Sequence, residues 1–392
     1  MTAAACIYLD NNATTPLDPR VLEVMTRAWL DYGANPASQH SAGRRARKAV
    51  EEAREGLLAM LGGNITGMRA DRLIFTSGGT EANHLALHGL LNREQPKRGL
   101  AISALEHPSI QGTTEALRQQ GVPVDRLPVL SNGQIDLAAV PPLLTRHVEE
   151  RPQLMSVMLA SNETGVIQPV QEVAQMAEPA HVLVHTDAVQ AIGKMPVHFR
   201  QLGVAAMTVA AHKFHGPIGI GALLVRHDVQ LQPQMFGGFQ QGSLRPGTES
   251  VALAVGFLRA LQLWQHEAAG RTERMRQLRD QLSASLQAEL PTSVIVGHDS
   301  PRTPHTLCIA FPALDRQALV MALDFAGVAC STGSACASGS SEPSPTLVAM
   351  GLSKDVVGSA IRLSCGAFTT AAEVAEAAAR IIKTVKQLQR AN

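Results

Sequence analysis

The sequence predicts an α/β protein in which a mixed, mainly parallel central sheet is joined to a smaller α+β lobe. The chain has 392 residues, and single hydrophobic cores stop growing at roughly 250–300 residues, so two lobes are expected. From about Leu73 to Val225, short apolar runs alternate with amphipathic stretches. Continuous apolar runs of this kind are typical of strands that are buried on both faces of a parallel sheet.

Six apolar runs in this region are predicted strands. Polar residues or glycines follow the runs before the next helical pattern begins. Their sequences are RLIFTSGG, GLAISALEH, LMSVMLASNE, HVLVHTDA, AAMTVAAHK and IGIGALLVR. Because ligands of parallel α/β sheets bind beyond the carboxyl ends of the strands, the polar residues after these runs are candidate site residues.

A second lobe is predicted beyond a long helix at VALAVGFLRALQLWQ. The later part of the chain holds a helix around DRQALVMALDFAG, a final helix from about Thr370, and the strand-like runs SVIVG, TLCIAF and AIRLSCG. We expect residues 17–262 to form the large domain, and residues 1–16 with 263–392 to form the small one.

Composition argues against several classes of protein. The formal net charge is +1, from 34 Lys and Arg against 33 Asp and Glu, and the two signs are interspersed, unlike the basic surface of a nucleic-acid-binding protein. No run approaches the roughly 18 apolar residues of a membrane span, and the N-terminus has no targeting pattern. We therefore expect neither nucleic acid nor a membrane as a direct partner.

The cysteines predict a reducing cytoplasm and no metal site. They are odd in number and scattered, which argues against a disulfide framework. They stand at Cys6, Cys308, Cys330, Cys336 and Cys365. Neither paired CxxC motifs nor a His/Cys cluster with zinc-ligand spacing occurs, so no metal ligands are expected.

Cys336 stands apart from the other cysteines because it lies in the Ser/Gly/Pro-rich loop 331–345. A structural cysteine usually packs as a small hydrophobe inside an element, whereas a loop of this composition leaves a thiol accessible. The alternative is that this cysteine is accidental. Long loops in compact domains are often functional, which favours a reactive thiol.

Three strand ends together predict a site for pyridoxal 5'-phosphate (PLP). Gly79 and Thr80 open a predicted helix, where backbone amides and the helix dipole favour a phosphate. Asp187 can hold a proton on a ring nitrogen, and the partly desolvated Lys213 can bind the aldehyde as a Schiff base. Each has an ordinary alternative, namely a capped glycine turn, a helix N-cap and a solvated loop lysine. Their combination favours the cofactor.

The chain resembles the cysteine desulfurases over essentially its whole length. The motifs that carry the resemblance are YLDNNATTP (8–16), NPASQH (35–40), TSGGTEAN (76–83), EHPS (106–109), SNETGV (161–166), HTDAVQAIGK (185–194), AHKFHGPIGIGAL (211–223), RPGTES (245–250) and STGSACAS (331–338). The long cysteine loop resembles the NifS/IscS branch of these class V aminotransferase-like PLP enzymes. The resemblance implies the PLP-dependent transferase fold of the aspartate aminotransferase type.

The resemblance also implies a role for each matched residue. Lys213 is the Schiff-base lysine, Asp187 pairs with the pyridinium nitrogen, and His107 stacks on the ring and takes part in catalysis. The other implied cofactor ligands are Gly79, Thr80 and His212 at the phosphate, Thr248 from the neighbouring subunit at the same phosphate, and Asn162 and Gln190 at the ring and its hydroxyl. Arg362 would bind the substrate carboxylate through its two-pronged donor geometry, with Asn35 as a second substrate-binding residue.

Several of these positions have other readings or depart from the family. His107 could be a capping residue, Asn162 a turn former and Arg362 a surface ion-pair partner. Ala210 replaces the family's usual serine, so one hydroxyl contact to the phosphate is expected to be missing. Phe239 is bulkier than the residue in many relatives, which predicts a narrower entrance. The chain ends at KQLQRAN without an extended tail for docking a scaffold protein, which leaves the sulfur acceptor open.

In this reading the thiolate of Cys336 attacks the substrate sulfur and carries it away as a persulfide, and the flexible loop lets the sulfur swing out to an acceptor. Cys330 is the rival nucleophile, but its place at a predicted strand end favours a half-buried structural role. Cys365 could lie near the site. Cys6 and Cys308 fall in apolar runs and are expected in the core.

The sequence thus predicts a homodimeric, cytoplasmic, PLP-dependent cysteine desulfurase. It would convert L-cysteine to L-alanine and pass sulfur to an acceptor protein, such as an iron–sulfur scaffold or a thiolation protein. One alternative is a PLP-dependent C–S lyase or selenocysteine lyase on the same scaffold. Another is a non-catalytic sulfur-trafficking protein, favoured only by Ala210. A hydrolase built on Cys336 and a histidine would leave Asp187 and Lys213 unexplained.

Overall fold

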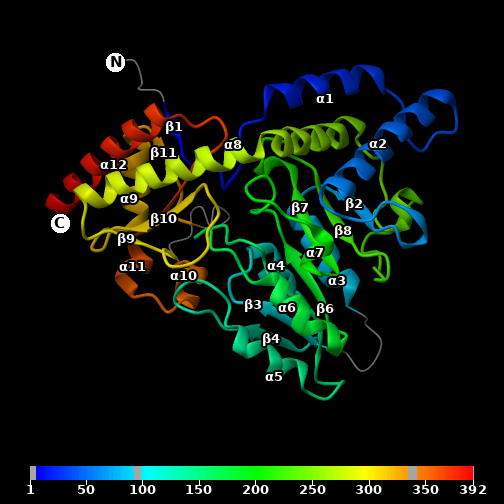
Figure 1. The fold of residues 1–392 in the computed structure, drawn as a ribbon, viewed down its shortest axis with the longest axis horizontal. Helices are drawn as coiled ribbons and strands as arrows, with labels where there is room; N and C mark the ends of the chain where they lie inside the picture. Colours follow the sequence, from blue (N-terminus) through cyan, green and yellow to red (C-terminus); the bar gives the residue numbers. More distant parts are fainter. Residues whose placement is uncertain (1–5, 92–98, 334–341, 392) are drawn as a thin grey trace.

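A seven-stranded mixed sheet forms the centre of the larger part of the molecule (Figure 1). The structure is a computed structural model that describes residues 6–91, 99–333 and 342–391. The strand order is β2-β8-β7-β6-β5-β3-β4. The strands are β2 (Arg72–Thr76), β3 (Gly99–Ser103), β4 (Val124–Leu127), β5 (Pro152–Ser156), β6 (Leu183–Asp187), β7 (Ala206–Ala210) and β8 (Gly221–Val225).

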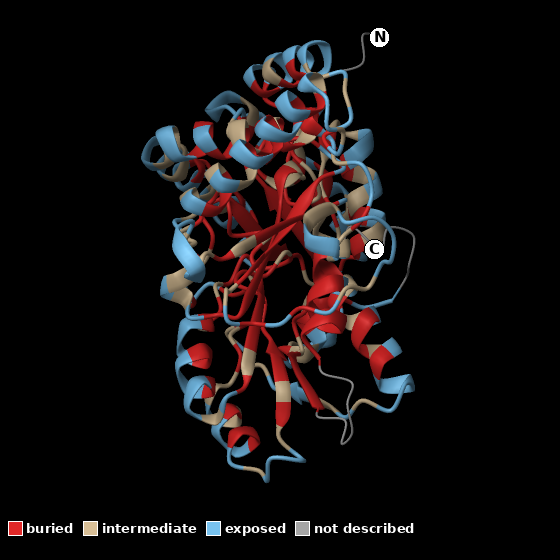
Figure 2. Ribbon diagram, turned by 90° about the vertical axis from the view of Figure 1, so that its right-hand side faces the viewer, coloured by how far each residue is buried: buried red, intermediate tan, exposed pale blue. Residues whose placement is uncertain are grey.

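The sheet is parallel except at one side. Strands β4, β3, β5, β6 and β7 pair in parallel, whereas β8 runs antiparallel to both of its neighbours, β7 and β2. Apolar side chains from the two faces enter different hydrophobic clusters, and the strands lie buried between exposed helices (Figure 2). Burial on both faces explains why the strand residues read as continuous apolar runs.

Helices connect the strands and cover the sheet. They are α1 (Pro19–Asp31), α2 (Ser41–Met60), α3 (Gly79–Leu90), α4 (Pro108–Gln119), α5 (Val140–Leu144), α6 (Val170–Ala177) and α7 (Phe199–Leu202). Asp18 caps α1 by accepting a hydrogen bond from the Arg20 amide, with Pro19 in the first turn. This combination of an acidic cap and a proline is a strong start signal, because the capping oxygen satisfies a free amide and proline has no amide to satisfy.

The long helix α8 (Val251–Glu289) links the two parts of the molecule (Figure 1). Its first half contributes Phe257 and Trp264 to the hydrophobic cluster of the large sheet. Its second half contributes Leu278 and Leu286 to a separate cluster around the later strands. One continuous helix therefore fixes how the two cores are placed.

The second part is built on short antiparallel strands. Strand β10 (Thr306–Ala310) pairs with β12 (Ala360–Ser364) and β9 (Val294–Ile295), while β1 (Ile7–Tyr8) pairs in parallel with β11 (Val328–Ala329). The helices here are α9 (Arg316–Phe325), α10 (Pro345–Ala349), α11 (Lys354–Ser359) and α12 (Ala371–Ala391). The N-terminal segment thus packs on elements that lie more than 300 residues later in the chain.

The α/β class and the mainly parallel sheet are confirmed, and the structure adds details to the sequence prediction. Strand β4 was not predicted, because its sequence VDRL is polar and only partly buried at the sheet edge. The helix predicted at residues 251–265 continues to Glu289. Cys6 was expected in the core but is exposed just before β1, which is a two-residue strand. No described helix is both long and apolar enough to cross a membrane.

Candidate active site

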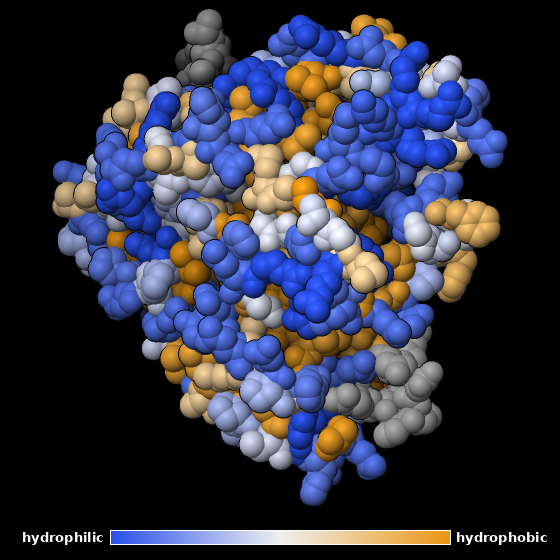
Figure 3. Space-filling view, turned by 45° about the vertical axis from the view of Figure 1, so that its right-hand side comes forward, coloured by the Kyte–Doolittle hydropathy of each residue, from blue (hydrophilic) through white to orange (hydrophobic). Residues whose placement is uncertain are grey.

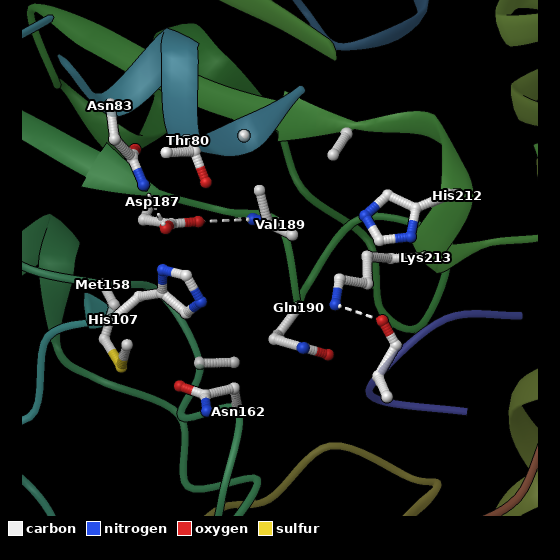
Figure 4. Close-up of a pocket in the computed structure, with 14 residues that line it drawn as sticks. Thr80, Asn83, His107, Met158, Asn162, Asp187, Val189, Gln190, His212 and Lys213 are labelled. Carbon is white, nitrogen blue, oxygen red and sulfur yellow. Dashed lines mark hydrogen bonds between the residues drawn. The ribbon is translucent and has the colours of Figure 1, made fainter. Parts of the chain in front are cut away.

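A cavity of about 230 Å³ lies beyond the carboxyl ends of the parallel strands (Figure 4). Its walls come from the segments that follow β2, β3, β5, β6 and β7, together with the N-terminal segment. The lining residues are Ala13, Gly79, Thr80, Asn83, His107, Met158, Ala160, Asn162, Asp187, Val189, Gln190, Ala210, His212 and Lys213. The structure therefore gathers most of the sequence-predicted cofactor residues at one place.

Gly79 and Thr80 form the first turn of α3 at the cavity wall. A Cβ atom on Gly79 would lie 3.1 Å from Val189 Cγ2 and 3.9 Å from Ala210 Cβ, so a side chain here would crowd this end of the cavity. The free amides at the start of a 12-residue helix make an anion site, which suits a phosphate. Ala210 contributes only a methyl group to the same wall.

Asp187 ends β6 with its carboxylate buried at the cavity. Its Oδ2 accepts a hydrogen bond of 2.7 Å from Asn83 Nδ2, and its Oδ1 accepts one of 2.9 Å from the Val189 amide. The carboxylate thus caps the following turn, as the ordinary reading expected, and also faces the cavity. Two donors fix its orientation.

Lys213 ends the short 3₁₀ helix η4 (Ala211–Lys213) that follows β7. Its Nζ donates hydrogen bonds of 2.7 Å to the Asn12 carbonyl and 2.8 Å to the Ala13 carbonyl. Figure 4 shows Lys213, Gln190, His107 and Asp187 pointing toward one another around the cavity. Two neutral carbonyls thus hold the amine within reach of a ligand.

His107 is both the N-cap of α4 and a wall of the cavity. Its Nδ1 accepts a hydrogen bond of 3.1 Å from the Ser109 amide. Because that amide can only donate, the neutral ring carries its proton on Nε2. Burial lowers the pKa of His107, and the positive charge of Lys213 adds to this while Asp187 opposes it. A neutral imidazole therefore faces the cavity at neutral pH.

Two other titratable groups beside the cavity are also neutral at neutral pH. Burial, with Lys213 and Lys194, lowers the pKa of His212 to about 4. Burial raises the pKa of Glu106 to about 8, and its Oε1 accepts hydrogen bonds from the Met158 amide at 2.7 Å and Ser103 Oγ at 2.9 Å. Neither His212 nor Glu106 therefore adds a charge to this part of the site at neutral pH.

Unpartnered polar atoms at the cavity point to a polar ligand. Gln190 donates from Nε2 to the Asn12 carbonyl at 3.0 Å, but its buried Oε1 has no hydrogen-bond partner among the described residues. The buried Oδ1 of Asn83 is likewise without one among them. Buried polar groups normally have a partner, so these atoms suit a ring with its own polar substituents.

Arg362 lies behind the cavity wall rather than on it. The side chain is 1% exposed, and it donates at 2.6 Å to Asp10 Oδ1, at 2.9 Å to the Asn162 carbonyl and at 2.5 Å to the Gly333 carbonyl. Its Nε has no partner among the described residues. Arg362 is therefore a buried ion-pair partner, not a surface one, and it links the Asn162 turn to the chain just before residue 334.

The remaining predicted residues lie away from this cavity. Asn35 and Thr248 are exposed, and Asn35 lines a second cavity with Phe239 and Glu249. Cys336 lies outside the described residues. Gly333, before Cys336 in the sequence, and Ser344, after it, both lie close to Glu163. The Oε2 atom of Glu163 accepts a hydrogen bond of 2.6 Å from Ser344 Oγ and lies close to Gly333.

The other cysteines do not line the cavity. Burial raises the pKa of the Cys308, Cys330 and Cys365 thiols to about 12, so these groups stay protonated at neutral pH. Cys330 is half-buried directly after β11, as expected, and Cys365 is buried directly after β12. None of these three meets the requirement of a low thiol pKa for a nucleophile.

Sequence reasoning did not single out several residues that shape the site. Asn83 supports Asp187, Asn12 supports Lys213 and Gln190, and Glu106 packs behind the cavity. A signal for Asn83 was present, because it follows Thr80 by three positions and so shares its face of α3. Asn12 had no local signal, since its partners lie far along the chain. Within the described residues no cluster of His, Cys, Asp or Glu suits a metal ion.

Comparison with known proteins identifies the family. The Aminotransferase class-V family model matches residues 7–376. A cysteine desulfurase of Cereibacter sphaeroides is 40% identical over 94% of this chain and 92% of its own length. The cysteine desulfurase NifS of Azotobacter vinelandii is 34% identical over 98% and 94%.

Solved structures agree with the sequence comparison. The structure of a NifS-like protein from Rickettsia africae superposes with a TM-score of 0.87 at 29% identity, covering 98% of this chain and 99% of that one. A second NifS-like protein gives a TM-score of 0.88 at 32% identity, covering 98% and 100%. The chain therefore belongs to the class V aminotransferase family and, within it, to the PLP-dependent cysteine desulfurases.

Proposed function

We propose that this protein converts L-cysteine to L-alanine and hands the sulfur on as a persulfide. The main support for the proposal is that one cavity is lined by Lys213, Asp187 and the first turn of α3. These groups supply an amine, a carboxylate and an anion site in one cavity. They are the three functions a protein needs to hold PLP.

The residues present fit that cofactor. The amides around Gly79 and Thr80 would hold its phosphate with His212, and Asp187 would pair with its ring nitrogen. His107 would stack on the ring, Gln190 and Asn162 would contact its polar substituents, and Lys213 would bind its aldehyde. When bound, PLP supplies an electron sink that makes the bonds at the substrate's α-carbon easier to break.

Arg362 would bind the substrate carboxylate, with Asn35 as a further substrate contact. Arg362 carries an unpartnered Nε among the described residues and two terminal nitrogens that bond to Asp10 and to backbone carbonyls. To bind a carboxylate through two donors, the guanidinium must give up at least one of these partners. The neutral ring of His107 would move protons at the substrate, because its lowered pKa leaves it able to accept one.

The sulfur would be taken by Cys336. Its thiolate attacks the substrate sulfur, an S–S bond forms, and the C–S bond of cysteine breaks to leave alanine once the carbon is protonated. The fixed chain before the loop supports this assignment. Cys336 follows Gly333 by three positions, a reach of at most about 10 Å, and Arg362 ties the Gly333 carbonyl to the Asn162 turn at the cavity.

A homodimer forms part of the proposal. Thr248 is exposed and away from the cavity of its own chain, which suits a residue that reaches the phosphate in a neighbouring subunit. Asn35 lies on the same surface as Phe239, and the side chains of Phe236 and Phe239 are 86% and 91% exposed. Figure 3 shows further apolar side chains exposed among hydrophilic ones on one face of the molecule.

We also propose a destination for the sulfur and a cellular location for the protein. The acceptor would be an iron–sulfur scaffold or a thiolation protein. A reducing cytoplasm suits the free thiols of Cys6, Cys308, Cys330 and Cys365. We also propose the division into a large domain, 17–262, and a small domain, 1–16 with 263–392. The pairing of β1 with β11 supports it, and the boundary falls within α8.

The test is product analysis of wild type and Cys336→Ala with L-cysteine, PLP and a reductant. Wild type should release alanine and sulfide in equal amounts, because each turnover moves one sulfur atom to the enzyme and frees one alanine. Cys336→Ala should release almost none of either. Cys330→Ala is the matched control and should resemble wild type. Undiminished sulfide from Cys336→Ala would assign the protein to the C–S lyases instead.

A further inference from the structure

A buried lysine that the proposed reaction does not use lies directly behind Lys213. Lys194, in the turn after β6, is 2% exposed, and its Nζ donates a hydrogen bond to the backbone carbonyl of Lys213. Among the described residues no carboxylate forms an ion pair with it. Burying an amine without a counterion is costly, so a hydrophobic residue would be expected here if the position served only to fill space.

The backbone of this turn packs closely against the segment that follows Lys213. Gly193 has φ of +75°, and a Cβ atom there would lie 2.1 Å from Phe214 Cβ, so only glycine lets the two segments approach this closely. On the other side, Thr272 Oγ1 of α8 donates a hydrogen bond of 3.3 Å to the Lys194 carbonyl. Lys194 is thus fixed between α8 and η4.

Among Lys194, Arg271 and the three histidines near them, Lys194 is the group whose charge changes near neutral pH. Lys194 has electrostatic interactions with five titratable or charged groups. They are Lys213, Arg271, His212, His215 and His305. Arg271 is permanently charged and lies 3.5 Å from Asp18. Burial lowers the pKa of His212 and His215 to about 4 and that of His305 well below its ordinary value. Burial, with Lys213 and Arg271, lowers the pKa of Lys194 to about 7.

We propose that Lys194 is a positioning residue for Lys213, holding its main chain through the carbonyl and, when protonated below neutral pH, repelling the Lys213 ammonium so that more of the amine is free there. A lysine beside another cation is a known way to activate an amine. The free amine adds to the cofactor aldehyde, and one water molecule leaves. This inference rests on the proposed role of Lys213 and extends it to a residue that does not itself line the cavity.

The experiment measures cofactor capture rather than turnover. Full-length protein freed of cofactor is mixed with pyridoxal 5'-phosphate across the mildly acidic, neutral and alkaline range, and the rate is followed by visible absorbance. Borohydride, which donates hydride to the adduct, then fixes it for peptide mass spectrometry. The variants are Lys194→Met, which removes charge and donor, and Lys194→Gln, which removes the charge but keeps a donor. Lys48→Met, at an exposed site on α2, is the matched control.

Below about pH 7, where Lys194 is protonated, both Lys194 variants should capture the cofactor several-fold more slowly than wild type relative to their own rates at high pH, because a like charge has been removed. At high pH, Lys194→Gln should retain the wild-type rate and Lys194→Met should be several-fold slower. Melting curves check the fold, and Lys194→Gln carries the test below about pH 7 by itself if Lys194→Met does not fold. Relative rates below about pH 7 equal to those of wild type, with the adduct on Lys213, overturn the inference alone. An adduct absent from Lys213 in wild type overturns the proposed function with it.

Discussion

Asn83 Nδ2 donates a 2.7 Å hydrogen bond to Asp187 Oδ2 at the wall of the cavity. The two residues come from α3 and from the end of β6, so the contact joins the helix whose first turn is the proposed phosphate site to the proposed partner of the ring nitrogen. Asp187 keeps one further donor, the Val189 amide. The orientation of the carboxylate therefore depends on a side chain that sequence reasoning did not single out.

Replacing Asn83 with alanine should weaken binding of PLP about tenfold. A hydrogen bond to a charged group contributes roughly 1.5–3 kcal/mol, and its loss lets the Asp187 carboxylate turn away from the ring nitrogen. The measurement is an equilibrium titration of cofactor-free protein followed by visible absorbance. Asn132→Ala, outside the cavity, serves as the control. Equal affinities for Asn83→Ala and the control would show that Asp187 does not need this donor.

Adding a hydroxyl at Ala210 should tighten cofactor binding. Ala210 is 1% exposed and lines the cavity near Gly79, so Ala210→Ser would place a donor beside the expected phosphate. One net hydrogen bond contributes about 0.5–1.5 kcal/mol, which corresponds to a gain of roughly twofold to tenfold. The same titration measures it. A loss of affinity would mean that the phosphate is held elsewhere or that the wall has no room for the oxygen.

Arg362→Lys should lower both stability and substrate affinity. A lysine amine cannot reproduce the planar set of donors that now serves Asp10, the Asn162 carbonyl and the Gly333 carbonyl. We expect the KM for L-cysteine to rise about tenfold or more and the melting temperature to fall. Steady-state kinetics and thermal unfolding measure the two effects. Arg380→Lys is the control, since Arg380 pairs with the exposed Glu376 on α12.

The buried carboxyl of Glu106 should make stability depend on pH. Its pKa rises from 4.5 to about 8 on burial. Between these values the unfolded chain has lost the proton that the folded protein keeps, so this group makes the protein less stable as pH rises through the window. The penalty is absent at low pH and complete above about pH 8.

Glu106→Gln tests this dependence. The amide oxygen can accept the same hydrogen bonds from Met158 and Ser103, but it does not ionise. The free energy of unfolding of the variant, minus that of wild type, should grow from pH 5 to pH 8. Urea unfolding at several pH values gives this difference and cancels the contributions of the histidines and Lys194. A flat difference would mean that Glu106 is ionised in the folded protein.

The sequence by itself determined the fold class and the chemistry of the strand ends. Strands buried on both faces are mainly apolar, so β2, β3, β5, β7 and β8 are visible as runs in the sequence. The residues after them were identifiable because parallel strands bring their carboxyl ends to one edge. Gly79, Asp187 and Lys213 were therefore predicted to meet, and they do.

Only the tertiary structure decided which neighbours these residues have. Asn12 meets Lys213, Arg362 meets Asp10, and Lys194 turns back on the Lys213 carbonyl. None of these pairs is marked by a local pattern, because each depends on segments that pack together from distant parts of the chain. The same holds for the buried Glu106 and Lys194, whose pKa values depend on how completely the fold removes water from them.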